Sequence, residues 1–155
     1  MSFKRLSNIE LQALEKEFVQ FLAANTITQK DWDKIKKSDA EKTEHLINLF
    51  SNIVWEKTLG NIKYLEFVSE KDYKVFYCGR DKIYVRALSI KKGDATLNTH
   101  TIKQLIDLNA QAEIQVQHLN SDKAYSPSRS EELYRMIEQG CTIGTEDSFK
   151  SLDFN

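Results

Sequence analysis

Residues 61–92 read NIKYLEFVSEKDYKVFYCGRDKIYVRALSIKK. Apolar and polar side chains alternate along this stretch in three runs, which is the pattern of β-strands that bury one face. The two connections, residues 69–72 and 79–81, are too short to hold a crossover helix. The three successive strands are therefore predicted to pair antiparallel as a meander.

The residues before this meander have a helical period instead. Apolar side chains recur at steps of three and four, which predicts helices over about residues 8–24, 29–37 and 39–59. Their starts are marked by pairs with the spacing of N-terminal caps: Ser7 with Glu10, Thr28 with Asp31, and Ser38 with Glu41. Such amphipathic helices need a surface to bury their apolar stripes, and the sheet is the expected one.

The residues after the meander return to mixed patterns. We expect a helix over about 99–109, a short strand over about 113–119 and a turn at 120–122. A further helix should begin at Ser128 and end at Gly140, and a final turn from Thr145 should dock Phe149 and Leu152. The predicted fold class is α+β. A three-helix N-terminal layer packs on a small, mainly antiparallel sheet (meander, helix, strand, helix), in a single domain over residues 1–155.

Composition fits a folded domain and excludes several classes of protein. The 155 residues are 41% hydrophobic, with 22 basic and 23 acidic side chains and a net charge of -1. Five glycines and one proline exclude collagen-like and low-complexity chains. The first residues lack the apolar core of a signal peptide, and no apolar run reaches the roughly 20 residues of a membrane span. We expect a cytoplasmic protein in which Cys78 and Cys141 are reduced.

Motifs for catalysis, cofactors and metals are sparse. The glycines never form a phosphate-binding loop, and His45, His100 and His118 lie in different predicted elements. Asp72 and Lys74 match the acid-x-lysine motif of a nuclease. They lie at the start of the second predicted strand, whereas the motif belongs on the third. The sequence therefore predicts no catalytic residue, metal ligand or cofactor, and favours a protein that is not an enzyme. A metal-dependent hydrolase stays open as a weaker alternative.

Basic side chains gather in the meander. Residues 61–95 carry eight basic and five acidic side chains, among which Lys82, Arg86, Lys91 and Lys92 are candidates for nucleic-acid binding. The sequence pI of about 6.3 is low for a dedicated nucleic-acid binder. The other explanation is that lysines guard a solvated sheet edge against pairing with another chain.

Three stretches resemble a family of small, uncharacterised cytosolic proteins from Bacteroidota. They read LEKEFVQFLAAN at 14–25 leading into DW at 31–32, LFSNIVWE at 49–56 with YLE at 64–66, and KAYSPSRSEE at 123–132 with IEQG at 137–140. The likeness spans nearly the whole chain. It implies a bacterial cytoplasmic setting and assigns no catalytic residue.

Polar side chains in the third of these stretches suggest a surface for a partner. Tyr125, Arg129 and Glu132 lie on or just before the last long helix, and tyrosine and arginine recur among binding hot spots. Arg129 and Glu132 are one helical turn apart, so a surface ion pair is their ordinary explanation and a partner-binding patch is the sharper alternative. The leading hypothesis is a non-catalytic adaptor or regulatory module that binds another protein. An RNA- or ribosome-associated binder that uses the basic meander is the second.

Overall fold

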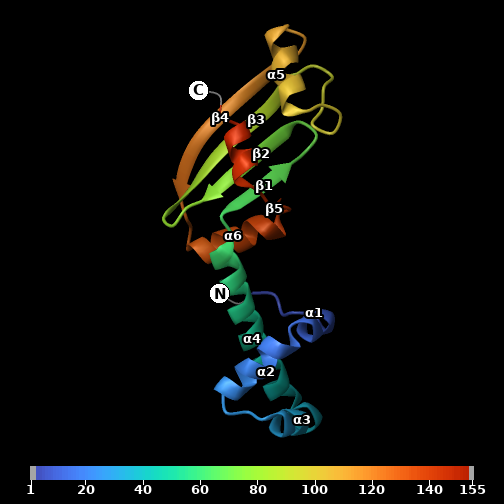
Figure 1. Ribbon diagram of the computed structural model, residues 1–155, viewed down its shortest axis with the longest axis vertical. Helices are drawn as coiled ribbons and strands as arrows, with labels where there is room; N and C mark the ends of the chain where they lie inside the picture. Colours follow the sequence, from blue (N-terminus) through green and yellow to red (C-terminus); the bar gives the residue numbers. More distant parts are fainter. Residues whose placement is uncertain (1–2, 154–155) are drawn as a thin grey trace. The chain divides into compact units, whose positions relative to one another are not determined.

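The computed structural model describes residues 3–153, which divide after Gly60 into two compact units (Figure 1). The first holds helices and the second holds a sheet with three further helices. The α+β class and the order of helices before sheet are confirmed. The expected single domain, with its helical layer packed on the sheet, stays a prediction, and each unit is described by itself. None of the helices within residues 3–153 is long and apolar enough to cross a membrane.

The helical unit contains α1 (Asn8–Ala13), α2 (Glu15–Ala24), α3 (Gln29–Ser38) and α4 (Ala40–Asn61). Its apolar stripes pack on one another and form a core of their own. The buried members of that core are Leu6, Phe18, Leu22, Trp32, Leu46, Ile47 and Phe50. Leu49 and Ile53 are exposed, because α4 turns the stripe of Leu46, Ile47 and Phe50 to the core.

Helix caps are confirmed at two of the three predicted starts. Ser7 with Glu10, and Thr28 with Asp31, form reciprocal capping boxes. The prediction at Ser38 was wrong, because Ser38 is the last residue of α3 and Asp39 instead accepts the Lys42 amide at 3.0 Å. The single helix expected over 8–24 is divided at Leu14, whose φ of -107° and ψ of 25° leave the helical region.

The sheet unit is built on β1 (Tyr64–Val68), β2 (Asp72–Cys78) and β3 (Lys82–Lys92), which pair antiparallel as the predicted meander. It continues with α5 (Ile102–Ala110), β4 (Gln115–Ala124), α6 (Arg129–Glu138), β5 (Thr142–Ile143) and α7 (Glu146–Ser151). The five strands lie in the order β4-β3-β2-β1-β5 and are all antiparallel.

The largest departure from the prediction is the length of β4. The turn expected at Asn120, Ser121 and Asp122 is wrong, since these residues continue the strand and pair with Arg86, Val85 and Tyr84 of β3. Asn, Ser and Asp have low strand propensity, but the long neighbouring strand offers a full ladder of backbone hydrogen bonds that overrides it.

One face of the sheet holds the main core of this unit. Its buried members are Val75, Leu88, Ile90, Ala95, Leu105, Ile114 and Leu152. In Figure 1, α7 lies across this part of the sheet, and its Phe149 packs against the same core. The docking predicted for Phe149 and Leu152 is confirmed.

Two glycines give opposite expectations for substitution by alanine. Gly93 has a φ of +108°, and a Cβ there would lie 2.5 Å from Ile114 Cγ2, so Gly93→Ala should destabilise the sheet unit by about 2 kcal/mol. Gly60 lies in α4 with nothing within 4 Å of its added Cβ, so Gly60→Ala should stabilise the helix by about 0.5 kcal/mol. Urea unfolding of both variants measures the two changes in the free energy of unfolding. Changes of the same sign would contradict the expectation.

Candidate functional site

A row of tyrosines crosses three neighbouring strands. Tyr64 of β1 pairs directly with Tyr77 of β2, which pairs directly with Tyr84 of β3. Direct partners project their side chains from the same face, and the ring centroids lie 5.3 Å and 5.8 Å apart. Tyr77 and Tyr84 are 37% and 42% exposed, so this row is an aromatic surface that remains open to solvent.

Helix α7 forms a wall beside this row. The ring of Phe149 lies 5.9 Å from that of Tyr64 and 6.1 Å from that of Tyr77. Burial, and after it the nearby Glu146 carboxylate, raises the pKa of Tyr64. The Tyr64 hydroxyl therefore stays protonated at neutral pH and keeps its proton for donation.

Arg86 fixes the junction between the wall and the sheet. It lies two positions after Tyr84 on β3, so its side chain projects from the same face. The guanidinium lies 4.1 Å from the centroid of the Phe149 ring, and its Nη1 donates to the Phe149 carbonyl oxygen at 3.1 Å. The positive charge is thus held in place beside the aromatic rings.

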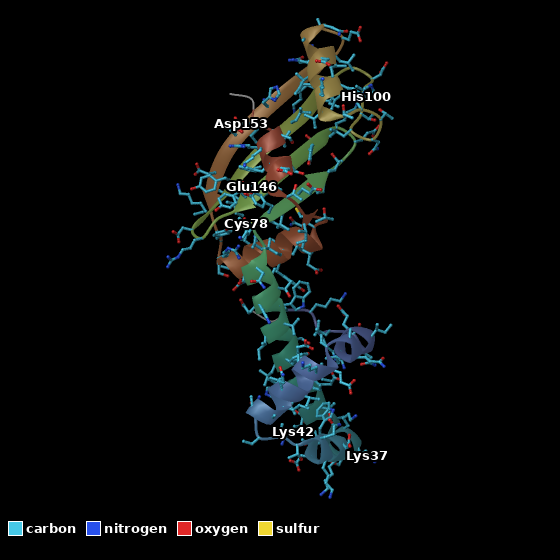
Figure 2. All side chains as sticks on the ribbon, in the orientation of Figure 1. Lys37, Lys42, Cys78, His100, Glu146 and Asp153 are labelled. Carbon is cyan, nitrogen blue, oxygen red and sulfur yellow. The ribbon has the colours of Figure 1, made fainter. Side chains whose placement is uncertain are left out.

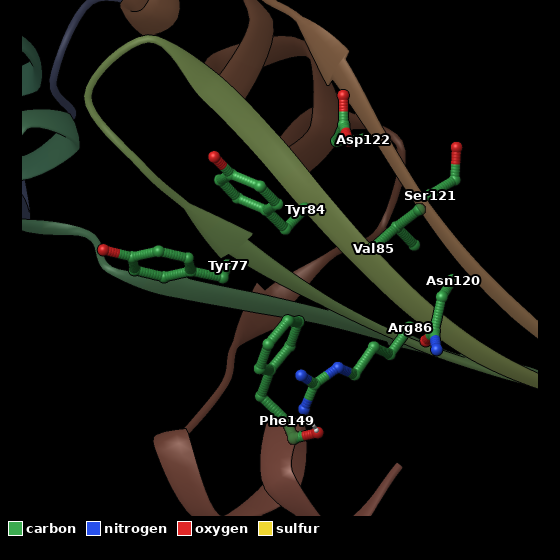
Figure 3. Close-up of a pocket in the computed structure, with 8 residues that line it drawn as sticks. All are labelled: Tyr77, Tyr84, Val85, Arg86, Asn120, Ser121, Asp122 and Phe149. Atoms are coloured by element: carbon green, nitrogen blue, oxygen red, sulfur yellow. Dashed lines mark hydrogen bonds between the residues drawn. The ribbon is translucent and has the colours of Figure 1, made fainter. Parts of the chain in front are cut away.

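These side chains line an open groove of about 450 Å³ (Figure 3). Its lining, called the aromatic groove below, consists of Tyr77, Tyr84, Val85, Arg86, Asn120, Ser121, Asp122 and Phe149. The sheet and α7 supply the apolar rings, while β4 supplies the Asn120 amide and the Asp122 carboxylate, which project from the same face as Arg86 and Tyr84. Aromatic rings with a few polar groups at one side are typical of a binding site.

The predicted basic residues are not all brought together. Arg86 lies in the groove, and Lys82 pairs with Asp122 at its border, with Nζ 3.4 Å from Oδ1. Lys91 and Lys92 are at the other end of β3, about 30 Å and about 33 Å from Lys82 at about 3.3 Å per residue. Since β3 is an inner strand, between β2 and β4, the explanation that its lysines guard a sheet edge is wrong.

The predicted partner-binding residues, by contrast, do come together, and they bind their own chain. Arg129 Nη2 donates to the carbonyl oxygens of Ile62 at 2.6 Å and Cys78 at 3.2 Å, and its Nε donates to that of Gly79 at 3.2 Å. The Tyr125 hydroxyl donates to the same Gly79 oxygen at 2.5 Å. These contacts tie the start of α6 to the end of β2.

Glu132 of α6 makes a second set of contacts within the chain. Its side chain is almost fully buried, accepts the Ser126 amide at 3.0 Å through Oε2, and forms an ion pair with Lys123 through Oε1. Burial opposes its ionisation, but the hydrogen bonds from Lys123 and Ser126 outweigh this, and its pKa lies below the ordinary value. We call Tyr125, Arg129 and Glu132 the α6 clasp. Partner binding by these three residues stays a prediction.

Two groups that could carry catalysis, Cys78 and His100, are separated. In Figure 2, Cys78 and His100 lie at opposite ends of the sheet. Burial raises the pKa of Cys78 to about 11, so its thiol stays protonated at neutral pH. Asp72 accepts the Ser89 hydroxyl at 2.5 Å, which ties β2 to β3. Within residues 3–153, no three His, Cys, Asp or Glu side chains converge as metal ligands.

The aromatic groove was not predicted from the sequence, although one signal for it was present. Each of the three predicted strands carries a tyrosine, namely Tyr64, Tyr77 or Tyr84. Only the register of strand pairing shows that these side chains project from the same face and lie side by side. The contribution of β4 was hidden by the turn that its Asn120, Ser121 and Asp122 had suggested.

Comparison with known proteins places the whole chain in one family. No curated protein and no solved structure matches it. Residues 1–154 match the family model described as "Family of unknown function (DUF6495)". A match of this extent means that the chain belongs to the DUF6495 family.

Proposed function

We propose that this protein is a non-catalytic interaction module that binds an extended segment of another protein in the aromatic groove. The observation that carries the proposal is the pair of exposed rings of Tyr77 and Tyr84, which lie 5.8 Å apart with 24° between their planes. Tyrosine offers a large contact area for little loss of side-chain entropy. Grooves lined with aromatic rings are a common way to bind extended peptides.

The charges of the sheet unit support a peptide over a nucleic acid. Residues 61–155 contain 13 basic and 14 acidic side chains. Asp122 lies in the groove, where its carboxylate would repel phosphates, and Lys82 is already paired with it. The polar groups of β4 suit the backbone amides of a peptide, which need both donors and acceptors.

Selection from a library of phage-displayed random dodecapeptides tests this proposal. We expect peptides that bind the wild-type chain and lose about tenfold in affinity for Tyr77→Ala and for Tyr84→Ala, because exposed aromatic anchors dominate such interfaces. Leu119→Ala is the matched control, since Leu119 is 51% exposed on β4 and does not line the groove. Fluorescence anisotropy measures the affinities. Peptides that bind all three variants alike would refute the groove as the site.

Single-stranded RNA is the second candidate ligand. Exposed aromatic rings on a sheet, with an arginine beside them, are also the platform on which unpaired bases stack. In this case fluorescein-labelled random RNA 12-mers should bind with an affinity that falls steeply with salt, and Lys82→Glu and Arg86→Glu should weaken binding further. A flat salt response would exclude this candidate.

The proposal assumes a bacterial cytoplasmic setting. Its support is the resemblance described above and the two cysteines, Cys78 and Cys141, which are both free thiols. Fractionation of cells that express a tagged copy tests the location directly.

A further inference from the structure

Strand β4 is the outermost strand on one side of the sheet, among the residues that the structure describes. It is ten residues long, contains neither proline nor glycine, and is exposed along nearly its whole length. Such an edge presents backbone donors and acceptors in a row and is a template for another strand.

The register shows which backbone groups face outward. The Ile90 amide donates to the Lys71 carbonyl oxygen, so the even-numbered residues of β3 face β2 and the odd-numbered ones face β4. Their partners on β4 are likewise odd-numbered, including Leu119, which pairs with Ala87, and Ser121, which pairs with Val85. Asn120 and Asp122 therefore direct their N–H and C=O groups to the outer edge.

A side chain closes one end of this edge. The Val116 amide donates to Asn109 Oδ1 of α5 at 3.0 Å, as expected for an even-numbered residue whose N–H points away from β3. The open part of the edge is therefore the second half of the strand, around Asn120 and Asp122.

The charges that usually protect an edge are held within the chain. Lys123 is the one lysine of β4, and its Nζ pairs with the buried carboxylate of Glu132. Asp122 pairs with Lys82 of β3. Leu119 lies on β4 between Val116 and Asp122, and about half of its apolar side chain is exposed. This edge lacks the outward lysines that prevent strands from pairing.

We propose that β4 pairs antiparallel with β4 of a second copy, through a twofold axis at Ser121. This register places Asn120 opposite Asp122 of the second copy, twice by symmetry, and each of these pairs can exchange two backbone hydrogen bonds. The Asn120 amide then lies beside the Asp122 carboxylate, donor against acceptor. Leu119 lies against the aliphatic stem of Lys123 of the second copy.

A second copy fits better than an unrelated strand because one symmetry operation satisfies both sides of each pair. The consequence concerns the aromatic groove, of which Asn120, Ser121 and Asp122 are lining residues. Pairing through β4 joins the two sheets into one and places the two grooves next to each other across the seam. Dimerisation is independent of the proposed peptide binding and can be tested without any ligand.

Sedimentation equilibrium of the full chain tests the proposal. The apparent mass should rise with concentration from 18.0 kDa toward twice that value. Asn120→Pro should weaken dimerisation about 30-fold, because it removes an outward N–H in each copy while leaving the pairing with β3 intact. Ser121→Lys, which places two like charges at the axis, should weaken it about fivefold. Gln117→Lys, on the same face of β4 but away from the axis, is the matched control.

Cysteine crosslinking fixes the register. In a Cys141→Ser background, Ser121→Cys should form a disulfide-linked dimer under mild oxidation, since residues opposite each other at the axis approach closely enough. Gln115→Cys on the same strand should not. A mass of 18.0 kDa at all concentrations, or a dimer that Asn120→Pro and Ser121→Lys leave unchanged, would overturn the proposal. Near-ultraviolet circular dichroism of each variant confirms that the sheet is folded.

Discussion

Replacement of Arg129 by alanine should destabilise the sheet unit by about 4 kcal/mol. The guanidinium donates to the carbonyl oxygens of three buried residues, Ile62, Cys78 and Gly79. A hydrogen bond from a charged donor contributes about 1.5–3 kcal/mol, and each oxygen left unsatisfied in a buried position adds to the loss. Arg129→Lys should lose about half as much, since an ammonium keeps the charge but lacks the planar fork.

The measurement uses reporters that the sequence supplies. All six tyrosines lie within residues 61–155, and both tryptophans lie within residues 1–60. Urea unfolding followed by the tyrosine circular dichroism signal therefore reports on the sheet unit, and tryptophan fluorescence reports on the helical unit. Arg135→Ala is the control, because Arg135 donates through one exposed hydrogen bond to Ser126, and it should cost less than about 1 kcal/mol. A loss of that size for Arg129→Ala would show that the clasp does not stabilise the fold.

Replacement of Glu132 by alanine should cost about 3 kcal/mol at pH 7, the second-largest effect. It removes a buried carboxylate that accepts the Ser126 amide and pairs with Lys123, leaving the amide and the ammonium without this acceptor. Glu132→Gln should cost less, because the amide oxygen can still accept the Ser126 hydrogen bond while the ion pair is lost.

The pH dependence follows from the direction of the pKa shift. The folded-state pKa of Glu132 lies below its ordinary value of 4.5, so its ionised form contributes stability that is present above about pH 4.5 and is lost as the pH falls through the folded pKa. The difference in unfolding free energy between wild type and Glu132→Gln should therefore shrink between pH 5 and pH 3. A difference that stays constant over this range would contradict the ion pair as its cause.

Short-range patterns were enough to predict the strands of the meander. The alternation in residues 61–92 is local, and the short connections allow only antiparallel pairing, so β1, β2 and β3 could be predicted. The break between α1 and α2 at Leu14 could not be predicted, because leucine favours helices and none of the neighbouring residues is a helix breaker. The second half of β4 was missed because pairing with β3 overrides weak local propensity.

The candidate site was harder to predict because it depends on long-range pairing. Arg129 and Ile62 are 67 positions apart, and no local spacing indicates that one donates to the other. The same holds for Arg86 and Phe149, 63 positions apart, which meet where α7 crosses the sheet. The sequence did single out Tyr125, Arg129 and Glu132 as unusual, but it could not show that their hydrogen bonds are made within the chain.

The burial of Leu152 has a consequence for folding during synthesis on the ribosome. Leu152 is fully buried in the core formed with Val75 and Leu88, so that core lacks a member until residue 152 has been translated. The buried core of the helical unit, in contrast, is complete once Phe50 has been added. Since translation is slow compared with helix formation, we expect the nascent chain to acquire structure in two stages, with the meander waiting for α7.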